Sequence, residues 1–297
     1  MLRQIAVNGH VYHHSAAMQD LQRNKGKFFV KSIGINNASV LPIFCEAHDR
    51  NTFAPLEQMP FTGTEEQCFL LAYRAICHEF SVKQRMLELI AVRRSYDAGQ
   101  SLLRQMHIQN HMNQIAMGYE LAVQDLSIYK QKLDLMLTSH DYSDIKAFIV
   151  FFETTPDVLC SSTHIPQCDF SGNSLQNLGE LTRNMELITF SLIATDGAGA
   201  FVFSWHKDAD NFSRALASSL NSLPNEEIPH AILRLIFGFC ENHYLRPSWW
   251  SQISEVDKNK INQRIETTAS PVKRYPTPLT DDGLRLVSWK VTGKSWV

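Results

Sequence analysis

No hydrophobic run in this chain is long enough to cross a bilayer. The longest apolar stretches, such as residues 147–152, are far shorter than the ~20 residues that a membrane-spanning helix needs. Residues 1–8 carry one positive charge and no continuous apolar core, so they do not resemble a secretory signal. We therefore expect a cytoplasmic protein with no membrane partner.

Cysteine is sparse, and neither sign of charge dominates. Six cysteines are scattered over 297 residues, which favours free thiols or metal ligands over a disulfide framework. The 28 Lys and Arg residues face 30 Asp and Glu residues, and the net charge of -2 gives no global attraction to nucleic acid or anionic lipid. Nucleic-acid binding would need a local basic patch, and the best candidate is the group Arg23, Lys25, Lys27 and Lys31.

The chain also lacks the short motifs of the most readily recognised enzymes. It contains no glycine-rich phosphate loop, no Gly-x-Ser-x-Gly, no His-Glu-x-x-His and no dinucleotide-binding fingerprint. The common enzyme classes that such motifs identify therefore have no support in this sequence.

The composition is that of a globular protein with a sizeable core, since 44% of the residues are hydrophobic and 20% are charged. We predict an α+β fold in three parts. Residues 1–62 form an irregular module that is a candidate for metal binding, residues 63–140 a long helical hairpin, and residues 141–297 an α+β body with an antiparallel sheet and flanking helices. No long Gly- or Ser-rich linker separates the parts, so we expect them to pack as one unit.

Two helices account for the predicted hairpin. Thr64 followed by Gln67 predicts a capping box, and apolar residues then recur at steps of three and four to about Arg94, before Gly99 ends the pattern. The next segment has an unbroken heptad seam, which consists of Met112, Ile115, Tyr119, Ala122, Leu126, Tyr129, Leu133 and Met136. We favour packing of this seam on the preceding helix, and the alternative is a dimerising coiled coil.

After Asp144 the pattern becomes typical of strands. Strands are predicted over residues 145–153, 187–194, 200–205 and 284–291. The Asp-Gly turn within residues 195–199 predicts that the two strands around it are antiparallel neighbours. Helices are predicted over residues 209–220, 229–244 and 247–267.

The most suggestive chemical motif is Cys45-x-x-His48. A tight turn can bring a thiolate and an imidazole to the ~2.0–2.3 Å that tetrahedral zinc needs, so these two residues form half of a candidate zinc site. The other half would have to come from among His10, His13, His14, Cys68, Cys77 and His78. The competing interpretation, a buried cysteine beside a hydrogen-bonded histidine, is favoured. His48-Asp49 also matches the adjacent pair of HD-type phosphohydrolases, but the neighbouring prolines argue against that setting.

Other residues could contribute to a site in the C-terminal half. Further metal ligands could come from Cys160, His164 and Cys168, or from Cys240 and His243, which are predicted to lie one turn apart on a helix. Core packing is the favoured explanation for the Cys240 and His243 pair, because its predicted helix is otherwise apolar. Glu241, followed by Asn242 and near several aromatic residues, could have a raised pKa and act as a general acid or base, although a structural hydrogen bond is favoured.

The run from Gly34 to Asp49, continuing through Phe53 to Glu57, resembles a family of uncharacterised bacterial proteins. The resemblance extends over most of the chain through Asn8-Gly9-His10-Val11 and through Glu241-Asn242 with Pro247, Trp249 and Trp250. Family members often carry an additional Cys- and His-containing stretch before this start, which with Cys45 and His48 resembles a treble-clef or HNH-type zinc module. The resemblance implies a bacterial origin and suggests phage defence as the setting, but it brings no established activity.

Two functions follow from these features. The favoured one is a non-catalytic binding or regulatory protein, whose hairpin and α+β body present a surface to a protein partner or to a second copy of the chain. The alternative is a metal-dependent, HNH-like nucleic-acid-processing enzyme, in which zinc or magnesium near His48 activates water. Its candidate catalytic residues are His48, Asp49 and Glu241.

Overall fold

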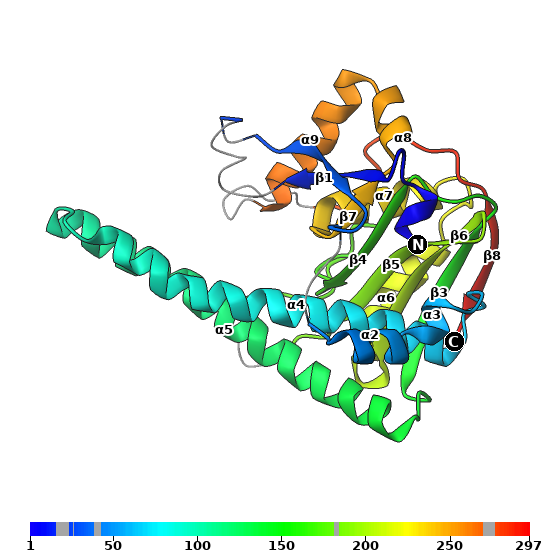
Figure 1. The fold of residues 1–297 in the computed structure, drawn as a ribbon, viewed down its shortest axis with the longest axis horizontal. Coiled ribbons are helices and arrows are strands. Elements are labelled where there is room, and N and C mark those ends of the chain that lie inside the picture. Colours follow the sequence, from blue (N-terminus) through cyan, green and yellow to red (C-terminus); the bar gives the residue numbers. More distant parts are fainter. Residues whose placement is uncertain (16–23, 26, 39–42, 181–183, 270–276) are drawn as a thin grey trace.

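One antiparallel sheet of eight strands organises the chain (Figure 1). The computed structural model describes residues 1–15, 24–25, 27–38, 43–180, 184–269 and 277–297. Across the sheet the strands are β2 (Phe29–Gly34), β1 (His10–Ser15), β7 (His243–Leu245), β4 (Val158–His164), β5 (Ile188–Thr195), β6 (Ala198–His206), β3 (Ile145–Phe152) and β8 (Val291–Trp296). The predicted α+β class with an antiparallel sheet is confirmed.

Helices cover the sheet and extend beyond it. They are α2 (Glu46–Thr52), α3 (Ala54–Glu57), α4 (Glu65–Arg94), α5 (Leu102–Ser139), α6 (Asp210–Asn221), α7 (Ile228–Phe239), α8 (Pro247–Gln252) and α9 (Glu255–Ala269), with short 3-10 turns η1 (Leu2–Gln4), η2 (Ser95–Asp97) and η3 (Lys207–Ala209). The first part of α4 crosses strands β3 to β6, and nearly every residue of β5 and β6 is buried. Both faces of the central strands are therefore covered. In the described part of the chain, no helix combines the length and apolarity needed to span a membrane.

The start of α4 is held by the predicted capping residues. Thr64 Oγ1 accepts a hydrogen bond from the backbone N–H of Gln67 at 3.2 Å. The side-chain oxygen of Gln67 in turn accepts from the backbone N–H groups of Thr62 and Gly63, at 2.9 and 3.1 Å. This reciprocal arrangement satisfies donors that a helix N-terminus leaves unpaired and fixes the direction in which the chain enters α4.

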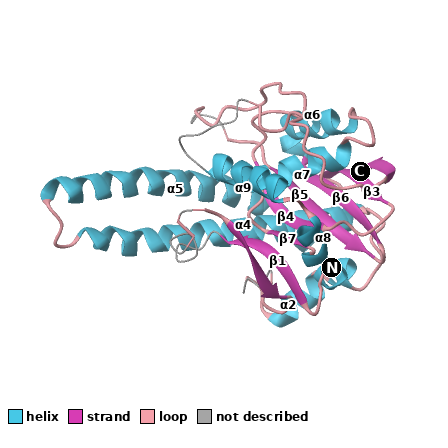
Figure 2. Cartoon of the chain, turned by 90° about the horizontal axis from the view of Figure 1, so that it is seen from above, coloured by secondary structure: helices cyan, strands magenta, loops and turns pink. Residues whose placement is uncertain are grey.

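Helices α4 and α5 form the predicted antiparallel hairpin, and its far end projects well beyond the sheet (Figures 1 and 2). The turn between them contains η2 and Gly99, which has φ +78°, a conformation that favours glycine. The seam residues nearest the sheet, Leu126, Leu133 and Met136 among them, are buried. The seam therefore packs on α4 within one chain, which is the arrangement that the sequence favoured.

The turn between β5 and β6 is also as predicted. Thr195 pairs with Ala198, and the two residues between them, Asp196 and Gly197, have φ +36° and +90°. Positive φ at both central positions is the geometry of a two-residue hairpin turn and explains the Asp-Gly sequence. The two strands are antiparallel neighbours from this turn to the pair Thr189 and Ser204.

Several elements differ from the sequence-based prediction. The last strand is β8 at Val291–Trp296, later than the predicted 284–291, and strands β4 and β7 were not predicted. Helix α7 ends at Phe239, because Cys240 takes an extended conformation and the chain returns to the sheet as β7. In the N-terminal part, the piece at residues 27–35 contains β2, whereas most of the piece at 40–44 lies outside the described residues.

Candidate functional site

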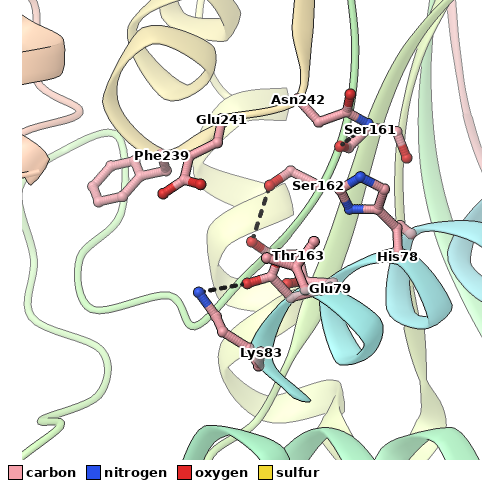
Figure 3. A pocket seen from close by; sticks show the side chains of 11 residues that line it. His78, Glu79, Lys83, Ser161, Ser162, Thr163, Phe239, Glu241 and Asn242 are labelled. Carbon is pink, nitrogen blue, oxygen red and sulfur yellow. Dashed lines mark hydrogen bonds and ion pairs between the residues drawn. The ribbon is translucent and has the colours of Figure 1, made fainter. Parts of the chain in front are cut away.

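A polar cleft of about 300 Å³ lies between the middle of α4 and strand β4 (Figure 3). Its third side is the connection between α7 and β7. The lining residues are Ala75, His78, Glu79, Val82, Lys83, Ser161, Ser162, Thr163, Phe239, Glu241 and Asn242. This volume is at the low end of the range for ligand-binding pockets, so the cleft suits a small molecule.

One ion pair and one unpaired carboxylate determine the charge of the cleft. Lys83 Nζ lies 2.9 Å from Glu79 Oε1, four residues earlier on the same face of α4. Burial opposes the charge on Lys83, but Glu79, with a smaller contribution from Glu241, outweighs it and raises the pKa of Lys83. Glu241 makes no hydrogen bond or ion pair with the described residues, and its side chain is exposed at the opposite side of the cleft (Figure 3). The two carboxylates and one ammonium leave the cleft with a net negative charge.

The remaining polar groups of the cleft are neutral. Burial lowers the pKa of His78, so its imidazole is uncharged near neutral pH. Ser162 Oγ donates to the backbone oxygen of Thr163 at 3.3 Å, and Asn242 Nδ2 donates to the backbone oxygen of Ser161 at 3.4 Å. The amide oxygen of Asn242 and the serine hydroxyls retain capacity to accept or donate further hydrogen bonds.

Behind the cleft, the structure brings together thiols and imidazoles from four elements. Cys160 of β4 lies opposite His243 of β7, and Cys240 closes the end of α7 beside them. Burial raises the pKa of Cys240, but hydrogen bonds with Cys160 and with His243 outweigh it and lower that pKa; burial raises the pKa of Cys160. His243 Nδ1 lies 2.7 Å from the backbone oxygen of Cys240, and its Nε2 lies 2.8 Å from His14 Nδ1.

These distances fix the hydrogen-bonding roles of the two imidazoles. Because a carbonyl can only accept, His243 Nδ1 donates to it, which leaves His243 Nε2 to accept from His14 Nδ1. Burial lowers the pKa of His14 well below its usual range, and the close approach of His243 disfavours the charged form of His14 further. The prediction that Cys240 and His243 lie on one helix is wrong, but their packing inside the core is confirmed.

The motif Cys45-x-x-His48 does form a local pair. Cys45 begins α2, and its Sγ lies 3.2 Å from His48 Nδ1, with both residues exposed. Asp49 is exposed on the same short helix. The prediction that this cysteine would be buried is therefore wrong. Within the described ranges, however, no three His, Cys, Asp or Glu residues are arranged to hold a metal ion, so only two of the four ligands of a structural zinc site are present.

The other proposed ligands lie apart from Cys45. Cys68 and Cys77 are buried on α4, where burial raises their pKa values to about 12 and about 11 and keeps them protonated. His164 and Cys168 are buried as well, and the ring of His164 lies 4.4 Å from that of Phe239. His10 bonds to the backbone oxygen of Asn8.

The candidate basic patch is only partly within the described residues. Arg23 lies outside them, and Lys25, Lys27 and Lys31 are exposed.

The far end of the hairpin is unusually apolar for an exposed surface. We call residues 85–121 the distal hairpin. Eight large hydrophobic side chains in it are exposed, namely Leu89, Val92, Tyr96, Leu102, Leu103, Met106, Met117 and Leu121. Leu103 is 81% exposed and Leu102 72%. An exposed apolar surface of this kind typically marks an interaction site.

Sequence reasoning identified only part of the cleft. Glu241 and Asn242 were singled out, and His78 only as a possible metal ligand. The Glu79–Lys83 pair has the favourable i, i+4 order, but that spacing equally describes an exposed helix face. Ser161, Ser162 and Thr163 gave no signal, because the strand that carries them was not predicted.

Comparison with known proteins adds no relative: no family model, no curated protein and no solved structure matches this chain. The resemblance carried by residues 34–57 and by the Glu241 region therefore stays a prediction.

Proposed function

We propose that this chain is a non-catalytic binding or regulatory protein that associates through its distal hairpin. The observation that carries the proposal is the concentration of exposed apolar side chains there. Eight of the fifteen large exposed hydrophobic residues in the described part of the chain fall within residues 85–121. Such side chains contribute little to the stability of the monomer, so their clustering favours burial against a partner.

The exposed residues are distinct from the seam that joins α4 to α5. On α5, Leu103 and Met106 are three residues apart and Met117 and Leu121 four apart. The two pairs lie on one side of the helix, with the exposed Asn110 and Asn113 between them, and together form an apolar stripe. The seam residues, such as Leu126 and Leu133, occupy other positions and are buried. The hairpin therefore has an internal seam and a separate apolar stripe open to a partner.

Charge favours a second copy of the chain as that partner. The tip of the hairpin carries three arginines and one aspartate, namely Arg93, Arg94, Arg104 and Asp97, and so has a net positive charge. On α5, residues 105–129 include Glu120 and Asp125 and no Lys or Arg. A two-fold axis between antiparallel hairpins would place the basic tip of each beside the acidic middle of the other. The same arrangement would cover both apolar stripes. We therefore propose a homodimer that forms through the distal hairpins.

Substitution within the stripe tests the proposal. Replacing Leu103 and Met106 with aspartate should convert a dimer into a monomer at micromolar concentrations, because two charges would be buried without partners within the interface. Light scattering coupled to size-exclusion chromatography gives the mass. Leu135→Asp is the matched control, since Leu135 is 70% exposed on α5 but lies outside the distal hairpin. A wild-type monomer, or a dimer that survives the double substitution, would contradict the proposal.

The cellular location and the biological process of the protein are also part of the proposal. We place the protein in the cytoplasm of a bacterium, with phage defence as its process. Support for the setting comes from the family resemblance of residues 34–57. The reducing conditions of a cytoplasm agree with the six free cysteines in the structure.

A second candidate is a metal-dependent nucleic-acid enzyme, supported by the 3.2 Å approach of Cys45 Sγ to His48 Nδ1. Both groups face solvent, so they could provide two ligands to zinc, and Asp49 lies on the same helix. The described residues supply no further ligands, so this site would need a partner chain or segment to complete it.

Metal content decides whether this candidate stands. Mass spectrometry of protein purified without a metal-affinity tag should find about one zinc per chain, and a Cys45→Ser/His48→Ala variant should lose it, because two of four ligands would be gone. Chelation should then abolish any cleavage of nucleic acid. Protein without metal, or zinc that remains in the variant, would remove the enzyme from consideration.

A further inference from the structure

We propose that the cleft between α4 and β4 binds a small hydroxylated molecule that carries one positive charge, of the size and kind of an amino sugar. This site is separate from the distal hairpin, which lies farther along α4 and α5. Three properties of the cleft support it: the sign of its charge, the supply of hydrogen-bonding groups and its volume.

The net negative charge of the cleft disfavours an anionic ligand and favours a cationic one. Lys83 is already neutralised by Glu79 at 2.9 Å, and the imidazole of His78 is uncharged. Glu241 therefore contributes a negative charge that no described residue balances by an ion pair. A phosphate or carboxylate ligand would be repelled by it, whereas a ligand ammonium could pair with it.

The hydrogen-bonding groups suit hydroxyls. Acceptors are available from Glu241, from the amide oxygen of Asn242 and from Ser162 Oγ, whose own proton goes to the backbone oxygen of Thr163. Ser161 Oγ accepts from Ser191 and has its proton left to donate. His78 makes no hydrogen bond to the described residues, so its neutral ring can donate one and accept one. A ligand hydroxyl both donates and accepts a hydrogen bond, so it can pair with this mixture of donors and acceptors in the cleft. An apolar ligand would leave these groups unpaired, at a cost to affinity.

The volume and the apolar lining restrict the ligand to about one ring. A cleft of about 300 Å³ leaves no room for an oligosaccharide or a strand of nucleic acid to be enclosed. Phe239 and Val82 supply apolar surface to the lining, which can contact the C–H face of a sugar ring. The polar groups come from both α4 and β4, so an occupying ligand would bridge the base of the hairpin and the sheet.

D-glucosamine is the probe for this site, with D-glucose and glucose 6-phosphate as comparisons. Isothermal titration calorimetry on the full chain, at a mildly acidic pH that keeps the amine protonated, should show saturable millimolar binding of glucosamine. Glucose should bind at least about fivefold more weakly, because it lacks the ammonium that pairs with Glu241. Glucose 6-phosphate should not bind.

The variant Glu241→Gln should reduce glucosamine affinity to that of glucose and leave glucose affinity unchanged. Because Glu241 is exposed and makes no hydrogen bond in the described structure, this variant should fold, which its melting temperature checks. Glu226→Gln, an exposed glutamate in the turn between α6 and α7, outside both the cleft and the hairpin, is the control and should behave as wild type. Three results would each overturn the proposal: no saturable binding of glucosamine, equal affinity for glucose, or no effect of Glu241→Gln. The oligomeric state does not enter this experiment, so it can fail without affecting the proposed dimer.

Discussion

Replacing Gln67 with leucine should destabilise the protein by about 3 kcal/mol. The side chain of Gln67 is 4% exposed and bonds to four backbone groups at once. Its oxygen accepts from Thr62 and Gly63, and its nitrogen donates to the backbone oxygens of Pro55 and Pro60 at 3.2 and 2.8 Å. Leucine has a similar size but can form none of these bonds, so several partly buried backbone groups would lose their partners.

Urea unfolding followed by circular dichroism measures this loss. Gln84→Leu is the matched control, because Gln84 is exposed on the same helix and makes no hydrogen bond among the described residues. It should change the free energy of unfolding by less than about 0.5 kcal/mol. If Gln67→Leu were equally mild, the side chain would not be holding residues 55–63 against α4, and the account of the helix start would be wrong.

Acidification should destabilise the protein, and His164 should account for a large part of the effect. His164 is buried, and burial lowers its pKa to about 4 from an ordinary value near 6.5. Between these values the unfolded chain binds a proton that the folded chain does not. The contribution of His164 to stability is therefore complete above about pH 6.5 and is lost as the pH falls towards 4. By pH 5 the loss from this residue should be about 2 kcal/mol.

The variant His164→Phe should flatten the dependence of the unfolding free energy on pH. Phenylalanine can keep the ring contact with Phe239 but has no proton to bind. Exposed His107 provides the control, because His107→Phe should leave the pH dependence as it is. Unfolding curves measured at several pH values between 7.5 and 5 compare the two. A slope unchanged by His164→Phe would mean that the folded and unfolded chains protonate this histidine at the same pH, so that burial does not lower its pKa. His14, whose pKa is also lowered by burial, should add to the remaining slope.

The hairpin and one turn of the sheet could be predicted because their signals are local. The Thr64–Gln67 cap, the heptad seam and the Asp196-Gly197 turn each depend on residues a few positions apart. Such short spacings are enough to predict helices from apolar periodicity and turns from residue type. These elements are confirmed with boundaries within a few residues of those predicted.

The rest depends on contacts between distant segments. Strand β7 has three residues and forms because β1 and β4 lie on either side of it, a pairing between residues more than 80 positions apart. For that reason the segment from Cys240 to His243 was mistaken for the end of a helix. The cleft was missed for the same cause: its hydroxyls lie on β4, and α4 reaches them only in the folded chain. The pairing of His14 with His243 is equally invisible in the sequence.

The cleft and the distal hairpin share helix α4. His78, Glu79 and Lys83 line the cleft, and Leu89, the first exposed apolar residue of the distal hairpin, is less than two turns farther along the same helix. A ligand that contacts both α4 and β4 would restrain the base of the hairpin whose tip is proposed to dimerise. The two proposals can be tested separately, but together they describe a binding protein in which a small molecule and self-association act through one helix.

Sedimentation equilibrium of the unmodified chain tests the central claim most directly. The chain has a mass of 33.9 kDa, and the account predicts a reversible approach to twice that mass as the concentration rises through the micromolar range. It also predicts weaker association at high salt, since the basic tip and the acidic middle of the paired hairpins attract each other. A mass that stays at 33.9 kDa at every concentration would contradict the claim that the distal hairpin pairs with a second copy.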